Sequence, residues 1–333
     1  MTVRHRLPRP DAGRGGPDRF ADVVGELVAE PGGAVVVRAD GTRVPVRPER
    51  VVAVRDVVAT TVPARPRRPD RAADAEALDL LASAHWPATT EQALGRWRLR
   101  AAGGFTRRAN SALVVGDPGV PLPAALEHVA RWYADRGLPP RVSAAADVAA
   151  DVVAAGWSRE LTVVVMTARV ADVLGVLPDG WADDGPRVRL DEAPAPGWLA
   201  DYRGAARHPD GPAVVRAPAG TTGLFATVQA PSRSAGGAPA GTLSGLPGRG
   251  RGVVSDGWVG LSCLAVDPVL RRHGVGRLVV ATLLDAALDA GAVRAYLQVD
   301  ADNGAAAAFH RAVGFRDHHT TVYLRGPSRR GPS

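Results

Sequence analysis

The last quarter of the chain alternates between the hydrophobic pattern of a buried strand and that of an amphipathic helix. Residues 258–266 are mostly apolar over the length of a buried strand. Beyond the loop 267–277, apolar residues recur at helical spacing. The buried stripe of that helix comprises Leu278, Leu283, Leu284, Ala287 and Leu288. A strand over 295–299 and a helix from Asn303 to Phe315 repeat the alternation, which predicts an α/β architecture.

The same rhythm extends backward over residues 186–325, which we assign to one domain. Apolar runs predict strands over 188–190, 223–229 and 250–254, and a helix over 196–203. Residues 231–249 are rich in Pro, Gly and Ser, which predicts an extended hairpin insertion outside the core. This insertion is either a tolerated surface segment or a lid over a substrate.

Residues 72–175 show a weaker form of the same pattern and predict a second lobe. Helices are expected over 73–84, 124–136 and 148–155, and strands over 97–100, 109–115, 141–143 and 161–166. Gly156-Trp157 mirrors Gly314-Phe315. The polar cluster 103–111 either reaches the cleft between the lobes or caps the face between them.

The first 60 residues form a separate small module. Short alternating runs over 19–60, with a turn at Ala39-Asp40-Gly41, predict a compact all-β barrel of the SH3-like kind. Residues 1–18 are expected to be a disordered basic tail, 61–71 a linker and 326–333 a second disordered tail. A barrel of this size is marginally stable alone, so we expect it to dock on the remainder.

The net charge of +7 over 333 residues comes from arginine, since the sequence contains no lysine. Much of the excess lies in the expected tails and linker, which makes nucleic-acid binding an unlikely main function. The single cysteine, Cys263, excludes an internal disulfide. The chain does not open with an apolar signal core, and no run reaches the ~18 apolar residues of a membrane span, so a cytoplasmic protein is expected.

The loop 267–277 carries the most informative chemistry. Gly274 and Gly276 permit crowded or left-handed backbone at the start of a helix, so that successive N–H groups converge on an anion. Arg271, Arg272 and Arg277 add positive charge. The order strand, R-x-x-G-x-G, helix therefore predicts a phosphate-binding site.

These motifs resemble those of the GNAT superfamily of N-acetyltransferases. The loop is similar to its acetyl-coenzyme A pyrophosphate loop, and Asn303, Ala306, Phe309 and Gly314-Phe315 fall in register with its second signature, N-x-x-A-x-x-[LF]-Y-x-x-x-G-F. The resemblance implies an α/β (α+β) GNAT fold, a mixed sheet flanked by helices. The lobe 72–175 then makes a pseudo-tandem, close to actinobacterial members with an SH3-like head. Its loop 116–121 lacks the arginines, and Ala145 replaces the Asn, so we expect no coenzyme A there.

The resemblance also assigns the cofactor site and the reaction. Acetyl-coenzyme A is expected as co-substrate, and a neutral primary amine attacks its thioester directly while both are bound. Backbone groups of the splayed fourth strand pair with pantetheine and stabilise the oxyanion. The residues implied for the cofactor are Leu264, Ala265, Val266, Arg271, Arg272, His273, Gly274, Val275, Gly276, Arg277, Asn303, Ala306 and Phe309.

The catalytic acid and base are less well defined by sequence. His310 stands where the family usually has Tyr as general acid, and it either donates that proton or merely lines the site. Asp300 and Tyr323 are the other catalytic residues we select. Further base candidates are Asp302, Asp256, His318 and His319, with helix capping and turn formation as alternative roles for the two aspartates. Cys263 is interpreted as packing.

The acceptor is not readable from the sequence, because fold does not determine substrate. A small-molecule amine and a protein amine remain open, with the barrel favouring a protein, and the chain is expected to be a monomer or homodimer. Two other functions remain as alternatives: a coenzyme A-binding regulator without turnover, and a nucleic-acid-associated protein that uses the barrel and the arginine tails.

Overall fold

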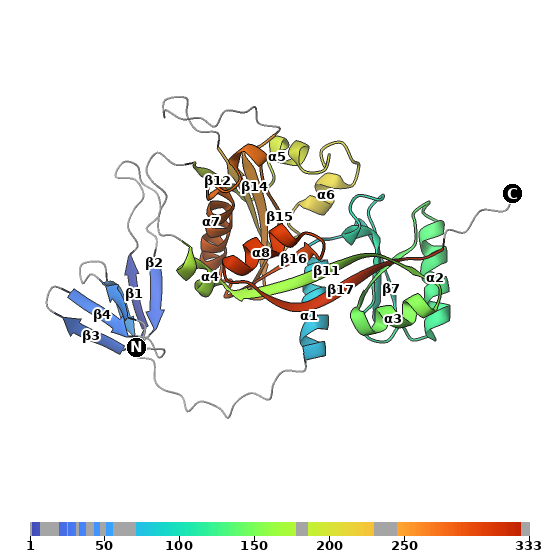
Figure 1. Cartoon of the computed structure of the whole chain (residues 1–333), viewed down its shortest axis with the longest axis horizontal. Coiled ribbons are helices and arrows are strands. Elements are labelled where there is room, and N and C mark those ends of the chain that lie inside the picture. Colours follow the sequence, from blue (N-terminus) through green and yellow to red (C-terminus); the bar gives the residue numbers. More distant parts are fainter. Residues whose placement is uncertain are drawn as a thin grey trace. The chain divides into compact units, whose positions relative to one another are not determined.

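The structure, a computed structural model of the chain, describes six strands between residues 2 and 55, together with residues 71–177, 186–229 and 245–327. The chain divides into two compact units, Met1–Pro69 and Asp70–Ser333, which are treated separately (Figure 1). The expected linker, the greater part of the insertion 231–249 and most of the C-terminal tail lie outside the described residues. No helix in the described part of the chain is long and apolar enough to cross a membrane.

The first unit contains two three-stranded antiparallel sheets. One sheet has the order β2-β1-β6, formed by Phe20–Val24, Thr2–Arg6 and Val51–Arg55, and the other has the order β3-β4-β5, formed by Glu26–Glu30, Gly33–Val37 and Arg43–Val46. The expectation that residues 1–18 form a disordered tail is wrong for Thr2–Arg6. This segment is the central strand of its sheet, because it pairs with β2 on one side and β6 on the other.

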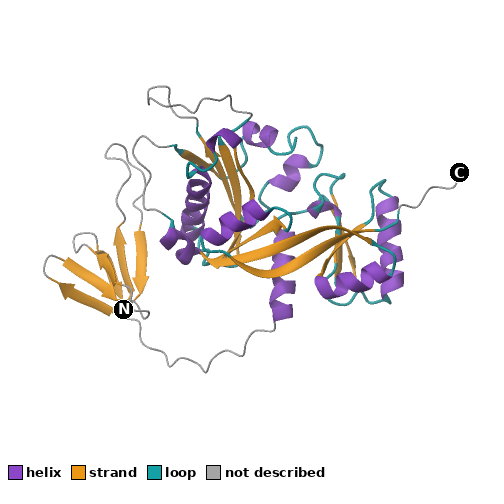
Figure 2. Ribbon diagram, in the orientation of Figure 1, coloured by secondary structure: helices purple, strands orange, loops and turns teal. Residues whose placement is uncertain are grey.

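The second unit is organised around one eleven-stranded mixed sheet, drawn as orange arrows in Figure 2. Its order is β12-β13-β14-β15-β16-β11-β17-β10-β9-β8-β7. In that order the strands are Val188–Asp191, Thr222–Val228, Gly248–Ser255, Trp258–Val266, Arg294–Asp300, Ser158–Arg169, Arg316–Arg325, Arg141–Ala145, Ala112–Leu113, Trp97–Ala101 and Thr90–Leu94. The sheet therefore joins the two segments that the sequence divides at about residue 180.

The two halves of the sheet have the same strand sequence in opposite directions, and two exchanged strands lie between them. On one side, β13-β14-β15-β16 is the run of the second segment, and on the other β7-β8-β9-β10 is the run of the first. Between them, β11 of the first segment pairs with β16, and β17 of the second pairs with β10. The two exchanged strands also pair with each other over nearly their whole length. Each half of the sheet is thus completed by the last strand of the other half.

Helices cover both faces of this sheet (Figure 1). The helices are α1 Arg71–Ala84, α2 Leu122–Ala134, α3 Ala146–Ala154, α4 Val170–Val176, α5 Pro196–Asp201, α6 Gly211–Val215, α7 Val275–Asp289 and α8 Gly304–Ala312. Alternation along β16 separates the faces: Leu297 packs in the core formed with α7, whereas Tyr296 packs with Leu78 and Ala82 of α1. Side chains on the α1 face therefore meet residues of both segments.

The predicted elements agree with the structure except at two places. Leu288 is 40% exposed, so it lies beside the buried stripe of α7 rather than in it. The strand expected over 109–115 is reduced to Ala112–Leu113, because Arg108–Asn110 forms a 3₁₀ turn instead. The cause is Asn110, whose buried amide makes four hydrogen bonds to the backbone of the loop 102–106 and holds it in a turn.

Candidate active site

A fork opens between the two parallel strands β15 and β16. They pair from Trp258–Arg294 to Leu261–Leu297, and no further pair follows in the ladder between these two fully described strands. β16 continues beside β11, where Gln298 pairs with Val165, and β15 continues beside β14. Residues 262–266 are consequently only half-buried. One edge of β15 is left free to pair with an extended ligand that enters the fork.

A β-bulge marks the base of the fork. Arg251 faces Ser262 and Arg249 faces Ala265, so one residue of β14 opposes two residues of β15. Cys263 lies in the bulge with a left-handed φ of 56°, a strained conformation for a residue with a side chain. Its thiol packs toward the aromatic cluster of Trp198 and Phe225, and burial raises its pKa. The packing role expected for Cys263 fits this environment.

The arginine- and glycine-rich loop ends the fork. Gly274 has φ 83° and is the N-cap of α7, and no side chain of the described residues caps this helix. The first N–H groups of α7 are therefore free for an anion. Arg271, Arg272, His273 and Arg277 are exposed around it, and Arg271 Nε donates to the Val266 carbonyl at 3.1 Å.

The second signature motif packs against this loop. A Cβ on Gly276 would lie 3.4 Å from Phe309 Cζ, so the ring of Phe309 rests on the start of α7. Ala306 is half-buried beside it, and Asn303 caps α8 by accepting from the Ala306 N–H at 3.1 Å. Asn303, not Asp302, is thus the side-chain cap of this helix. The start of α7 and the Phe309 side of α8 are therefore in contact beside the fork.

His310 does not have the environment of a proton donor. It is 6% exposed, its ring packs edge-on against Phe309 and Phe315, and burial lowers its pKa to about 4. Its Nδ1 atom is buried without a hydrogen-bond partner within the described structure. A general acid at pH 7 needs the opposite pKa shift, so the structure favours the packing alternative over the acid role.

Asp300 and Tyr323, the other two catalytic candidates selected from sequence, lie in different places. Asp300 is exposed at the end of β16, where Oδ1 accepts from the Asp302 N–H at 3.0 Å in a turn. Tyr323 is 5% exposed on β17, between Ser143 of β10 and Leu161 of β11. Tyr323 faces the α1 side of the sheet and lines a small cavity there with Gln298, whereas Asp300 does not line it.

That small cavity lies between the two segments, directly beyond the last β15–β16 pair. Its remaining walls come from α1, β8, β10, β17 and the 3₁₀ turn Arg108–Asn110, and they include Asp79, Ser83, Arg100, Arg108, Ser143 and Thr321. Arg108 and Gln298 are its partly exposed lining residues, and the others are buried, so these two side chains form its mouth. Sequence reasoning missed Asp79, Arg100 and Gln298, because their pattern is that of ordinary helix and strand positions.

A carboxylate and an imidazole meet at the inner wall of the cavity. Asp79 of α1 is 8% exposed, and its Oδ1 lies 3.2 Å from His319 Nε2 and 3.3 Å from Thr321 Oγ1. His319 Nδ1 lies 2.8 Å from Nδ1 of the half-buried His318. This arrangement connects the buried carboxylate toward the surface through two imidazole rings.

A second polar cluster fixes α1 on the sheet beside the fork. His85 Nε2 lies 2.9 Å from Ser255 Oγ, and its Nδ1 lies 3.0 Å from the Tyr296 hydroxyl. Burial, then the charge of Arg251, lowers the pKa of His85 to about 4. Arg251 is 1% exposed, and its guanidinium donates to three backbone carbonyls. These are the carbonyl of His85, just after α1, and those of Val215 and Arg216, at the end of α6. These contacts explain how a buried guanidinium is accommodated.

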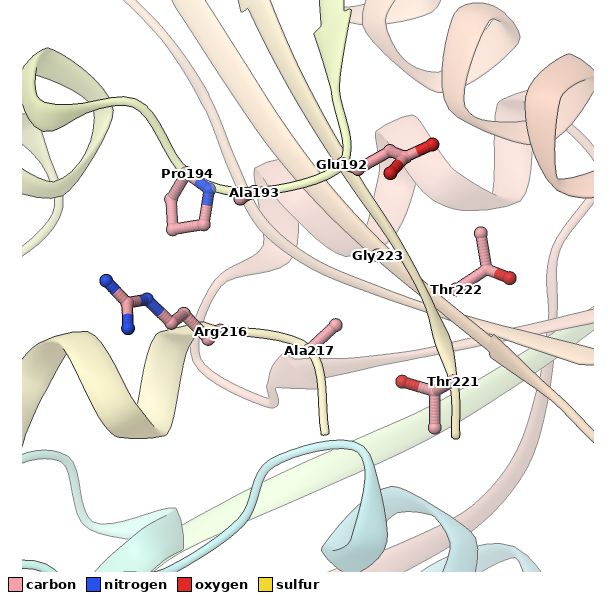
Figure 3. A pocket seen from close by; sticks show the side chains of 8 residues that line it. All are labelled: Glu192, Ala193, Pro194, Arg216, Ala217, Thr221, Thr222 and Gly223. Atoms are coloured by element: carbon pink, nitrogen blue, oxygen red, sulfur yellow. The ribbon is translucent and has the colours of Figure 1, made fainter. Parts of the chain in front are cut away.

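A larger cavity of about 330 Å³ lies elsewhere, at the start of β13 (Figure 3). It is bounded by Glu192–Pro194 on one side and by Arg216, Ala217 and Thr221–Gly223 on the other. Thr222 pairs with Val254 near the end of β14, and Val254 pairs with Val259 near the start of β15. The unpaired part of β15, residues 262–266, lies at the other end of that strand. This cavity is therefore at the opposite end of the strands from the fork.

A mixed sheet forked between two parallel strands, with an uncapped helix N-terminus at the open end, defines the class as a GNAT-type N-acetyltransferase. Residues 72–324 match the family model described as "Probable histone acetyltransferase Rv0428c C-terminal", and the chain belongs to this family. Residues 1–55 match its companion, "Rv0428c N-terminal Sm-like domain". The first unit is thus Sm-like, which corrects the SH3-like expectation.

Individual relatives agree with this assignment. The chain is 30% identical to the probable histone acetyltransferase Rv0428c of Mycobacterium tuberculosis, over 98% of this chain and 95% of that protein. It is 28% identical to the uncharacterized N-acetyltransferase YobR of Bacillus subtilis, over 75% of this chain and 98% of that protein. Among solved structures, a GCN5-related N-acetyltransferase from Kribbella flavida has a TM-score of 0.53 at 17% identity, over 78% of this chain and 95% of that one, which supports the fold.

Proposed function

We propose that this N-acetyltransferase transfers acetyl from acetyl-coenzyme A to a primary amine within a ternary complex. The observation that carries the proposal is the fork, because its free strand edge leads directly to the uncapped N-terminus of α7. A cofactor with an amide-containing arm and a pyrophosphate fits both features. The free edge of β15 offers backbone partners to the arm, and the N–H groups of α7 offer an anion site.

The residues divide the work of holding the cofactor. The backbone of Leu264, Ala265 and Val266 would pair with the arm. The loop Arg271, Arg272, His273, Gly274, Val275, Gly276 and Arg277 would hold the pyrophosphate, and Asn303, Ala306 and Phe309 would line the opposite side. The first segment lacks a comparable opening: its loop packs against Gly95 and Arg96, where the Arg96 N–H donates to the Asp117 carbonyl at 2.8 Å.

The reaction requires a neutral amine at the base of the fork. Its nitrogen attacks the thioester carbonyl, the carbon–sulfur bond breaks, and coenzyme A leaves as a thiolate that takes up a proton. The strained bulge at Cys263 turns the backbone of β15 at this point, so that an N–H is available for the oxyanion. Holding both reactants in this geometry supplies much of the rate enhancement.

The amine must lose a proton before or during attack, and we assign its removal to Asp79. Asp79 lines the same cavity as Gln298, the residue that follows the last β15–β16 pair. A proton taken up by this carboxylate, directly or through a water in the cavity, can pass to His319 and His318. In this proposal, Asp79 replaces Asp300 and His310 as the acid–base residue.

Calorimetric titration with acetyl-coenzyme A tests the cofactor site. Gly274→Glu places a carboxylate and a strained side chain at the anion site, so binding should weaken by about 100-fold or more. Gly291→Glu is the matched control: Gly291 follows the same helix, has a similar φ of 89°, and has open space around its Cβ position. Equal loss of binding in both variants, or no binding by the folded wild-type protein, would overturn the proposal.

The family description names a histone as the acceptor of one relative, and the amine acceptor of this chain is a separate question. The side chains at the cavity mouth bear on that question.

A further inference from the structure

We infer that the acceptor carries a carboxylate next to its amine, and that Arg108 binds this carboxylate at the mouth of the cavity between the segments. The inference rests on the proposed function, since it names the acceptor class for the same site. The acceptor class it specifies is a small, amino-acid-like molecule rather than a lysine-rich protein tail.

Arg108 lines the cavity but has no hydrogen-bond or ion-pair partner for its guanidinium within the described structure. Its side chain is half-buried and lies over the ring of Trp86, with the guanidinium carbon 5.4 Å from the ring centroid. Within the described structure the guanidinium forms no ion pair and donates no hydrogen bond. Its planar set of N–H donors is therefore held in place, next to the cavity, without a protein acceptor. A carboxylate matches this donor set in a bidentate way.

The loop 102–110 holds the Arg108 side chain in a fixed position. Asn110 accepts from the N–H groups of Ala102 and Gly104, and it donates to the carbonyls of Phe105 and Thr106 at 2.8 Å each. Trp86 is fixed in turn, because its Nε1 donates to Thr106 Oγ1 at 3.0 Å. A rigid loop and a rigid ring leave little conformational entropy to lose when Arg108 binds a ligand.

Arg108 is linked through Trp86 to the base of the fork, where the proposed reaction takes place. Trp86 also stacks with Arg251, which donates to Ser262 Oγ at the base of the fork. Gln298, the other residue of the mouth, follows the last β15–β16 pair, and its Oε1 is buried without a partner in the described residues. A ligand on Arg108 thus has an amide oxygen and the open strand edge beside it.

The charge of the site selects against polycationic acceptors. Arg100, Arg108 and Arg251 surround the mouth and the base of the fork, and Asp79 is the carboxylate that lines the same cavity. Burial raises the pKa of the neighbouring Tyr296; the charges of Arg108 and Arg251 oppose that rise, and the charge of Asp79 adds to it. A zwitterion matches this arrangement, with its carboxylate on Arg108 and its amine toward Asp79.

The test compares amines that differ only in the carboxylate. Release of coenzyme A is measured with phenylalanine against phenethylamine, with leucine against isopentylamine, and with a lysine-rich peptide. We expect the carboxylate member of at least one pair to have the higher kcat/KM. Arg108→Gln should lower that value on the order of 10- to 100-fold, mainly through KM, and leave the partner amine unchanged.

Arg107→Gln is the matched control. It removes the same charge from the neighbouring position, where the side chain is exposed and pairs with Glu160 at 3.4 Å instead of lining the cavity. Preference for amines without a carboxylate or for the peptide, or an equal loss for both pair members in Arg108→Gln, would overturn the inference while the proposed function stands.

A second measurement separates the two failures. If the protein binds acetyl-coenzyme A but acetylates nothing, the proposed function fails, and binding of N-acetylphenylalanine in the presence of coenzyme A then decides the role of Arg108. Binding that is weakened by Arg108→Gln and not by Arg107→Gln supports the carboxylate site. Absence of binding, or an unchanged affinity in Arg108→Gln, excludes it.

Discussion

Asp79 Oδ1 lies 3.2 Å from His319 Nε2, although the two residues stand at opposite ends of the second unit's sequence. Asp79 comes from α1, the first helix of the unit, and His319 from β17, its last strand. They meet because β17 crosses to the first segment's half of the sheet. The exchange of strands thereby creates the pair that we assign to proton removal.

Asp79→Asn should lower kcat by about 100-fold and leave the affinity for acetyl-coenzyme A unchanged, because it removes the proton acceptor but no cofactor contact. The remaining rate should rise about tenfold per pH unit, since it then depends on the fraction of acceptor that is already neutral. Steady-state kinetics across pH checks both effects.

Asp300→Asn is the control for that experiment, because Asp300 is exposed and its side chain serves a turn. We expect nearly wild-type kinetics from it. A large loss of kcat in Asp300→Asn with normal rates in Asp79→Asn would return the base to the end of β16.

His310 makes stability depend on pH. Burial lowers its pKa to about 4 in the folded state, against about 6.5 in the unfolded chain. Above pH 6.5 neither the folded nor the unfolded state binds this proton, so the full stability of the folded protein is present. As pH falls from 6.5 toward 4, only the unfolded state binds the proton, and the free energy of unfolding decreases. The loss amounts to roughly 3 kcal/mol.

His310→Phe should therefore flatten the decline of stability between pH 6.5 and 4, while the protein at pH 7.5 stays folded and active. Urea unfolding at several pH values measures the slope. The pKa of His85 is also lowered to about 4, so part of the dependence of the unfolding free energy on pH should remain in this variant. An unchanged pH profile, or loss of activity at pH 7.5 in a folded variant, would contradict the packing role of His310.

The exchanged strands should make the two segments fold as one. A chain that ends at Phe315 lacks β17, the strand that lies between β10 and β11 and pairs with both. We expect loss of cooperative unfolding in this variant, measured by circular dichroism against temperature. A chain that begins at Asp70 is the control, since the first unit is compact by itself, and it should unfold in a single transition.

Sequence reasoning placed the glycine-rich loop and the helices α7 and α8 correctly, because Gly274 and the apolar stripe of α7 are local signals. Asp79, which we propose as the base, was not singled out, because its position depends on which strands lie between β16 and β10, and pairing order is not encoded in local periodicity. Arg108 belongs to the cluster 103–111, for which the sequence left open whether it reaches the cleft between the lobes or caps the face between them. For His310 the motif position gives the residue type but not its burial, so the sequence left both the acid role and the lining role open. Strand β1 was missed because its basic residues resemble a tail, although it has partners on both sides.

Gly260 should be intolerant of any side chain, because the contact between the segments occupies its place. A Cβ there would lie 2.4 Å from the Tyr296 hydroxyl and 2.8 Å from His85 Nδ1. Gly260→Ala should therefore destabilise the protein by about 2–3 kcal/mol. Gly252→Ala is the control, as its Cβ would meet carbon atoms at 3.3 Å or beyond.

The double variant Gly260→Ala, Tyr296→Phe identifies the cause of that loss. Tyr296→Phe alone costs about 1–2 kcal/mol, since it leaves His85 Nδ1 without its partner. If the added Cβ acts by displacing the hydroxyl, the double variant should be less destabilised than the sum of the single changes, because the nearest of the clashing atoms is gone while the ring carbon Cζ at 2.6 Å and His85 Nδ1 at 2.8 Å remain. Additive losses in urea unfolding would instead mean that the ring of residue 296 and His85, rather than the hydroxyl, exclude a side chain at this position.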